Sequence, residues 1–252
     1  MRKSTMTVGL ILLLSLSAAA DVVVLKEGSL LASCNLLNPV FAGVTAANII
    51  NVTIDDTAFH DNWAANAGYG AAVSWDSSLD DKLIKFDLAS LPGFIGGTVN
   101  MAQLVFHQTA GNAGGATALI LTHDWNEATA GRYSPTGSTT LGWGAASNAK
   151  FSAAGDGAAL TAMTVGSFYT GPYSIYEAWL VGTVTADAQA IADGQANYGW
   201  YFQTSNRTIL TSEHSGDGYR PALYLDYTPV PEPATLAVLG LGVLFGSRRR
   251  RG

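Results

Sequence analysis

Short segments in which apolar and polar residues alternate recur along the middle of the chain, and clusters of Gly, Asn, Asp and Ser separate them. Alternation with a period of two is typical of β-strands that turn one face to a core. Ile84, Phe86 and Leu88, for example, fall on one face, opposite the charged positions between them. The pattern predicts strands at residues 22–25, 49–54, 83–88, 99–107, 118–122, 198–204, 208–211 and 222–227.

One helix is expected at residues 185–192, because alanines and Ile191 precede Gly194, a residue that commonly ends helices. The whole pattern predicts an all-β fold, an antiparallel β-sandwich or jelly roll with one short helix. Residues 55–229 are expected to form this sandwich, preceded by residues 21–54 as a strand pair or an arm. The ends of the chain add an N-terminal signal helix and a C-terminal hydrophobic helix.

The start of the chain has the three parts of a secretory signal peptide. Arg2 and Lys3 supply positive charge, and residues 8–16 form an apolar run. Residues 18–20 are three alanines, which suit signal peptidase and place the cut before Asp21. An apolar run of this length is too short to span a membrane, which takes about 20 residues. We therefore expect signal peptidase to remove this leader during export.

The end of the chain carries a proline-flanked glutamate, an apolar run at residues 234–246 and an arginine cluster, in that order. The candidate sorting-signal residues of this tail are Pro231, Glu232, Pro233, Arg248, Arg249, Arg250 and Arg251. As a helix the apolar run would reach about 20 Å, and the arginines can extend it toward the headgroups. Basic flanks stay cytoplasmic, so both ends point inward and the middle lies outside. The alternative, a buried strand with a solvated basic tail, is disfavoured by Gly240, Gly242 and Gly246.

With this motif, apolar run and basic end, residues 230–252 resemble a PEP-CTERM sorting signal. The resemblance implies a Gram-negative bacterium whose exosortase recognises and removes the tail. It also implies an inner-membrane intermediate, followed by a place at the cell surface or in the extracellular matrix. Association with exopolysaccharide or biofilm matrix is a further implication of the same resemblance.

The net charge of the chain becomes strongly negative once the signal peptide and the C-terminal tail are removed. The chain has 13 basic and 19 acidic residues, and its ends hold six of the basic ones. The remainder carries a net charge near −12. Such a surface repels nucleic acid and disfavours uronate-rich polysaccharide unless a cation such as calcium intervenes.

The single cysteine, Cys34, excludes a disulfide within the chain. Residues 31–34 resemble a lipobox, but Asp21, Lys26 and Glu27 separate them from the apolar run that a lipobox should end. A free or buried thiol is therefore expected rather than a lipidated one.

The middle of the chain also resembles the DNRLRE domain, which is similar to a family of carbohydrate-binding β-sandwich modules. The likeness runs from about residue 55 to 228 and rests on ordered pieces at residues 85–92, 97–104, 122–129, 184–186, 197–199 and 220–223. It implies a sandwich that binds polysaccharide without cleaving it.

Three aromatic residues are the candidates for sugar binding: Trp63, Tyr69 and Trp75. Sugar C–H faces stack on aromatic rings while the hydroxyls bind polar groups, and these rings lie in or near a polar stretch with Gly and Asn. The alternative is that the three rings cap the ends of the sandwich and pack inward.

Four carboxylates are candidates for a metal site: Asp55, Asp56, Asp61 and Asp226. Terminal strands commonly pair in sandwiches, so these oxygens could meet around a structural calcium ion. No spaced ligand motif supports the site, and ordinary solvated carboxylates are the alternative. No other cofactor is expected.

No catalytic signature occurs in the sequence, which lacks a Gly-x-Ser-x-Gly elbow, a P-loop and a dinucleotide fingerprint. The histidines His60, His107, His123 and His214 are scattered and show no metal spacing. We therefore expect a non-enzymatic polysaccharide-binding module. The alternatives are a structural matrix protein without a discrete ligand site and, third, a polysaccharide-degrading enzyme.

Overall fold

The computed structural model describes residues 19–31, 39–59, 74–75, 81–111, 116–130, 157–167, 178–203 and 207–231. In chain order the strands are β1 (Asp21–Lys26), β2 (Ile49–Asn51), β3 (Ile54–Phe59), β4 (Ser74–Trp75), β5 (Asp81–Phe86), β6 (Thr98–Gly111), β7 (Ala116–Leu121), β8 (Gly157–Ser167), β9 (Ala178–Thr183), β10 (Trp200–Gln203), β11 (Arg207–Leu210) and β12 (Ala222–Thr228). The helix is α2 (Thr185–Ala192), and the 3-10 turns are η1 (Pro39–Phe41), η2 (Ala46–Asn48), η3 (Leu88–Ser90) and η4 (Asp217–Tyr219).

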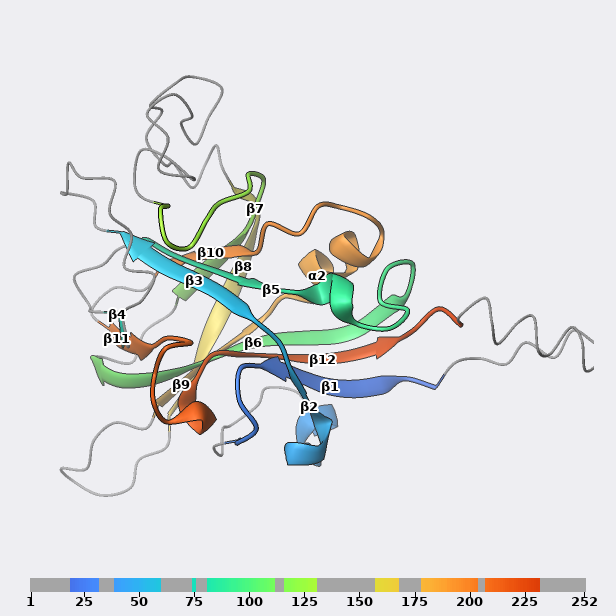
Figure 1. Ribbon diagram of the computed structural model, residues 1–252, viewed down its shortest axis with the longest axis horizontal. Coiled ribbons are helices and arrows are strands. Elements are labelled where there is room, and N and C mark those ends of the chain that lie inside the picture. Colours follow the sequence, from blue (N-terminus) through green and yellow to red (C-terminus); the bar gives the residue numbers. More distant parts are fainter. Residues whose placement is uncertain are drawn as a thin grey trace, which may run out of the picture.

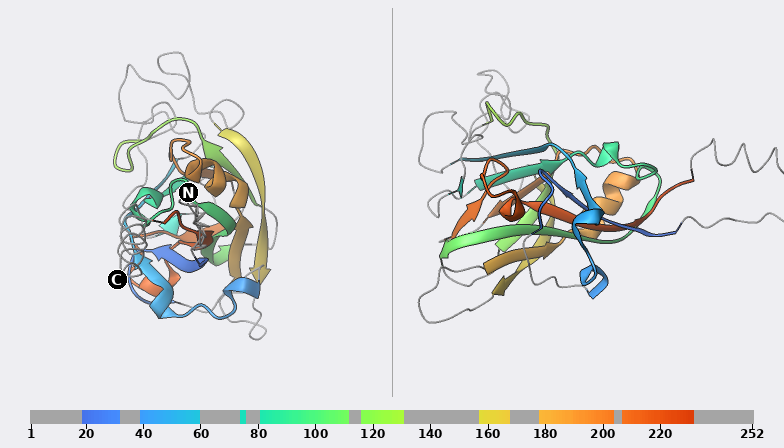
Figure 2. Two further views of the ribbon diagram at one scale, coloured as in Figure 1. Left: turned by 90° about the vertical axis from the view of Figure 1, so that its right-hand side faces the viewer. Right: turned by 60° about the horizontal axis from the view of Figure 1, so that its bottom comes forward.

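The strands follow one hydrogen-bonded order, β2-β1-β12-β6-β9-β8-β7-β10-β5-β3, and β11 pairs with β6 and β4. In a flat sheet β6 and β10 would lie nearly 20 Å apart, because neighbouring strands are spaced by about 4.8 Å. Instead, the rings of Phe106 on β6 and Phe202 on β10 have centroids 4.3 Å apart. The order therefore folds back into two facing layers, with one α-helix in the described part of the chain, consistent with a β-sandwich (Figures 1 and 2).

The apolar residues of both layers meet in a single interior. Leu104, Leu225 and Trp200 are among its fully buried members, and two smaller core clusters lie outside it. The face of β12 that points away from this interior is also covered. There Phe41 of η1 packs edge-on against Tyr224, with ring centroids 5.6 Å apart.

The helix predicted at residues 185–192 is confirmed with the same bounds by α2. It is joined to the segment before β6, since the Gly96 nitrogen donates to the Ala192 carbonyl at 2.7 Å. The Val99 nitrogen also donates to the Gln189 side chain at 2.7 Å. These bonds hold α2 against one end of the sandwich.

Each predicted strand has a counterpart, but β4, β8 and β9 were missed. Trp179, Leu180 and Val181 of β9 are consecutive and all buried, so this strand lacks the alternation that the prediction depended on. The sequence of β8 is rich in Gly and Ala, which rank low for strands. A strand as short as β4 carries no period at all.

The prediction of a single strand at residues 49–54 is wrong, because the strand is interrupted at Val52. Ile49 begins β2, which runs parallel to β1, whereas Ile54 begins β3, which pairs antiparallel with β5. The sheet is therefore not purely antiparallel. β1 lies between β2 and β12, so it belongs to the same sheet as the rest of the domain.

The described chain enters and leaves the sandwich at the same end (Figure 1). Asp21, the first residue of β1, pairs with Tyr227 near the end of β12. The Val230 nitrogen then donates to the Gly93 carbonyl at 2.9 Å. Gly93 has φ +64, and a side chain there would meet the backbone of Val230. The segments expected as signal helix and C-terminal helix, and Cys34, lie outside the described residues.

No helix in the described part of the chain is both long enough and apolar enough to cross a membrane.

Candidate functional site

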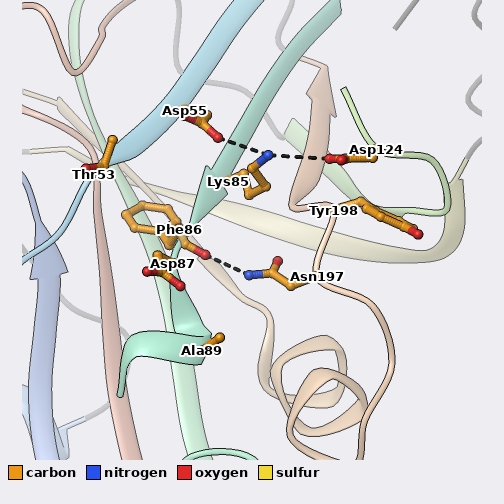
Figure 3. Close-up of a pocket in the computed structure, with 9 residues that line it drawn as sticks. All are labelled: Thr53, Asp55, Lys85, Phe86, Asp87, Ala89, Asp124, Asn197 and Tyr198. Carbon is orange, nitrogen blue, oxygen red and sulfur yellow. Dashed lines mark hydrogen bonds and ion pairs between the residues drawn. The ribbon is translucent and has the colours of Figure 1, made fainter. Parts of the chain in front are cut away.

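An open pocket of about 380 Å³ lies over β3 and β5, beside the segment before β10 (Figure 3). Lys85 is at its centre: the ammonium is 2.9 Å from Asp55 Oδ2 and 3.5 Å from Asp124 Oδ1. The same ammonium lies 5.3 Å from the centroid of the Trp125 ring. The ion pairs and the ring hold the lysine in one position between two carboxylates.

The other side of the pocket is built from the segment that leads into β10. Asn197 donates to the Phe86 carbonyl at 2.7 Å, which ties this segment to the end of β5. The Trp125 indole nitrogen donates to the Tyr198 carbonyl at 2.8 Å. The Tyr198 ring is half-buried against Trp125 and its neighbours, to one side of the Lys85 ion pairs. Hydrogen bonds from side chains to main-chain carbonyls therefore fix this wall of the pocket.

The pocket combines a partly accessible ring with groups that donate and accept hydrogen bonds. Lys85 and Asn197 carry N–H donors, and the exposed carboxylates Asp87 and Asp124 accept. Hydroxyl-rich ligands need both kinds of partner next to an apolar face. The arrangement can bind such a ligand from solvent.

A second polar cluster lies at the open edge of β3, on its core-facing side. Asp56, Glu127 and Glu213 each offer a carboxylate oxygen, and these oxygens lie within 4.8 Å of one another. Glu127 follows β7 and Glu213 follows β11, so three separate segments meet here. The Asp56 nitrogen donates to Glu127 Oε1 at 3.3 Å, and the Ser212 nitrogen donates to Asp56 Oδ2 at 2.8 Å.

Burial disturbs the ionisation of this acidic cluster. Asp56 is 0% exposed. Burial, helped by the negative charges of Glu213 and Glu127, raises the pKa of Asp56 well above its usual value against the opposing hydrogen bonds from Ser212. Burial also raises the pKa of Glu127 to about 7, and Glu213 adds to the effect. The hydrogen-bond donors around the three acids therefore do not offset the negative charge that the cluster would carry if all three were ionised.

The structure does not test the sugar-stacking role of Trp63, Tyr69 and Trp75. Trp63 and Tyr69 lie outside the described residues, and Trp75 is described only by its backbone in β4, where it pairs with Ile209. The described tryptophans Trp125, Trp179 and Trp200 are 3%, 4% and 0% exposed and so belong to the core.

Of the predicted metal ligands, the described residues Asp55, Asp56 and Asp226 do not lie in one cluster. Asp55 pairs with Lys85, and Asp226 accepts from Asn100 at 3.0 Å. Asp226 faces Val22, whereas β3 starts beside Glu27, whose Oε1 accepts from the Ile54 nitrogen. The five positions from 22 to 27 correspond to roughly 16 Å along a strand. Asp61 lies outside the described residues.

Among the described residues, Asp56 is the one predicted ligand that lies in a candidate cation cluster, and its companions Glu127 and Glu213 were missed. They follow it by 71 and 157 positions, and no local spacing connects them. The pocket residues Lys85, Asn197 and Tyr198 were missed for a similar reason. Residues 85–92, 122–129 and 197–199 were singled out only as pieces of a family resemblance, which did not assign them to a common site.

The comparisons with known proteins support the prediction of a C-terminal sorting tail. Residues 229–251 match the family model of the PEP-CTERM protein-sorting motif. No curated protein and no solved structure matches the chain. The motif implies an exported surface protein that an exosortase processes. Pro231 is the last described residue of the tail; Glu232, Pro233 and Arg248 to Arg251 lie outside the described part.

Proposed function

We propose that this exported surface protein holds neutral polysaccharide, without cleaving it, in the pocket beside Lys85. The observation that carries the proposal is the combination in one open pocket of the Tyr198 ring, the Lys85 and Asn197 donors, and exposed carboxylates. Sugar rings present an apolar C–H face and a rim of hydroxyls, which match such a lining.

Charge supports a neutral ligand. Asp55, Asp87 and Asp124 all line the pocket, and a uronate would meet their negative charge. Asp55 and Asp124 share the Lys85 ammonium. A glycosidase needs two carboxyl groups free to act on opposite sides of the scissile bond, so this pairing favours binding over hydrolysis.

Two further points favour a polysaccharide ligand. The likeness of residues 55–228 to the DNRLRE domain implies a carbohydrate-binding sandwich. The sorting tail directs the chain to the surface of what we propose is a Gram-negative cell, where exopolysaccharide is at hand. Signal peptidase and exosortase would each act at the end of the sandwich where β1 begins and β12 ends.

Affinity gel electrophoresis of the full chain in mild detergent, through gels containing neutral or uronate-rich polysaccharide, tests the proposal. Retardation by a neutral polysaccharide should be lost in Lys85→Ala and Asp124→Ala. It should persist in Asp193→Ala, an exposed acid at the end of α2 that does not line the pocket.

Trp63→Ala and Tyr69→Ala locate the site independently. Loss of binding in these two variants, with Lys85→Ala unaffected, would reject the Lys85 pocket and favour the loop aromatics. Absence of retardation by every polysaccharide, in a chain shown to be folded by circular dichroism, would favour a structural matrix protein instead.

A further inference from the structure

Within the described part of the chain, Asp56 has a buried oxygen without a hydrogen-bond partner, and it lies among acids. Asp56 is 0% exposed, its Oδ2 accepts from the Ser212 nitrogen at 2.8 Å, and its Oδ1 has no partner among the described residues. A buried acceptor left unpaired costs about 1–3 kcal/mol, and more if it is charged. Glu127 and Glu213 converge on the same place. We propose that Asp56, Glu127 and Glu213 form a structural calcium site at the open edge of β3.

The distances among the three acids suit one ion. Calcium binds oxygens at about 2.3–2.6 Å, so two oxygens on the same ion lie at most roughly 5 Å apart. One oxygen from each of the three residues falls within 4.8 Å of the other two. All three are carboxylates, the hard oxygen ligands that calcium prefers, and calcium accepts an irregular arrangement completed by water or carbonyls.

Hydrogen bonds already orient each carboxylate through one oxygen. Ser212 donates to Asp56 through its backbone nitrogen and to Glu213 Oε2 through its hydroxyl, the latter at 3.1 Å. The Asp56 nitrogen donates to Glu127 Oε1. Partners of this kind fix the ligands of metal sites before the ion arrives.

Two cations of the neighbouring segments, Lys85 and Arg220, are engaged with acids outside the cluster. Lys85 lies 2.9 Å from Asp55, and Arg220 lies 3.5 Å from Glu27. Asp55 and Glu27 are also the acids whose charges act on Glu127 from further away. A bound divalent ion would supply the positive charge that the cluster lacks.

Such an ion would join three segments that are far apart in the sequence: β3, the turn after β7 and the turn after β11. β3 is the last strand in the order, and its outer edge is where the Asp56 nitrogen meets Glu127. The site would therefore close an open sheet edge. It is separate from the Lys85 pocket, so it does not depend on the proposed polysaccharide binding.

Thermal unfolding of the full chain in mild detergent tests the site, with the protein first stripped by EDTA and then titrated with Ca²⁺ or Mg²⁺. Extracellular calcium modules have dissociation constants of about 10⁻⁴–10⁻³ M. At 10 mM Ca²⁺ we therefore expect Tm to rise by about 3–10 °C, with a much smaller rise for Mg²⁺. Equilibrium dialysis with ⁴⁵Ca²⁺ should give one ion per chain.

Asp56→Asn and Glu213→Gln are the test variants, and Asp55→Asn is the matched control. Asp55 is next to Asp56 on β3 but points to the opposite face, where it pairs with Lys85. The test variants should lose the Tm rise and the bound ⁴⁵Ca²⁺, while Asp55→Asn should keep both.

The competing explanation is that the acids share protons and bind no ion. In that case Ca²⁺ would leave the Tm of the EDTA-treated parent chain unchanged, and the parent chain would bind no ⁴⁵Ca²⁺. Either a flat calcium titration or an equal calcium response in Asp55→Asn and Asp56→Asn would overturn the site.

Discussion

The indole nitrogen of Trp200 on β10 donates a hydrogen bond of 3.0 Å to the carboxylate of Asp187 on α2, in the protein interior. Trp200 is 0% exposed and Asp187 is 4% exposed. Asp187 thereby supplies the acceptor that the buried N–H group of Trp200 needs. This bond fixes α2 on the sandwich in addition to its contacts before β6.

Removing the acceptor of this bond should destabilise the domain. We expect Asp187→Ala to lower the free energy of unfolding by about 1–3 kcal/mol, because the indole N–H stays buried without a partner. Asp187→Asn keeps an amide oxygen at the same place and should cost less. Urea unfolding followed by tryptophan fluorescence measures both. Equal losses in the two variants would show that the bond to Trp200 is not the cause.

Gly199 occupies a position that tolerates no side chain. Its φ is +79, and a Cβ there would collide with the Ile84 carbonyl oxygen and lie 2.8 Å from the Lys85 Cα. We expect Gly199→Ala to destabilise the domain by roughly 3 kcal/mol or more, because left-handed strain and a backbone clash add together.

Gly194 is the matched control for this substitution. It also has a positive φ, +104, but a Cβ there meets nothing within 4 Å. Gly194→Ala should therefore cost only the backbone strain, about 1–2 kcal/mol. Thermal unfolding of the two variants side by side measures the difference, and similar losses would contradict the clash with β5.

His107 should make the stability of the domain depend on pH. Burial, with a small contribution from His214, lowers the pKa of His107 to about 4. Its ring packs against Trp179 and Tyr219, with centroids 4.8 and 4.6 Å away. Between pH 4 and about 6.5 the unfolded chain binds the proton that the folded protein excludes. Stability should therefore rise with pH across this window, by at most about 3 kcal/mol, and level off above it.

His107→Phe isolates this contribution, since it keeps a ring between Trp179 and Tyr219 but does not titrate. Other acids titrate in the same range. The quantity to compare is therefore the difference in unfolding free energy between the parent chain and His107→Phe, measured at pH 4.5 and again at pH 7. A constant difference would mean that His107 is not the group responsible.

The residue pattern within a segment predicted those parts of the fold whose structure depends on that segment alone. α2 was found with its bounds because alanines and a terminal glycine mark a helix wherever it lies. β9 was missed because both its faces are buried, a property of its neighbours in the sheet and not of its own sequence. The break at Val52 was missed for the same reason, since β2 and β3 pair with different strands.

The candidate sites were less predictable than the fold, because their residues come from distant segments. Asp56 was recognised as an acid in a cluster, but only the folded chain brings it to Glu127 and Glu213. Asp226 looked equivalent in sequence, yet it lies near the opposite end of β1. The sorting tail, by contrast, is read as a continuous segment and needs no fold to be recognised.

Processing of that tail can be tested in cells. We expect a Gram-negative host with an exosortase to convert the chain to a shorter form, visible by immunoblotting and by mass. A variant with Pro231, Glu232 and Pro233 all changed to alanine should keep its tail and accumulate in the membrane fraction, because the motif that directs processing is lost while the apolar run stays.

Val230→Ala is the control for this variant. Val230 lies directly before the Pro-Glu-Pro tripeptide and is 44% exposed, and its backbone bond to Gly93 does not require the side chain. It should be processed like the parent chain. The shorter form should also be absent from cells without exosortase. If the triple-alanine variant were shortened as efficiently as Val230→Ala, another protease would be removing the tail, and the described domain would reach the surface independently of the motif.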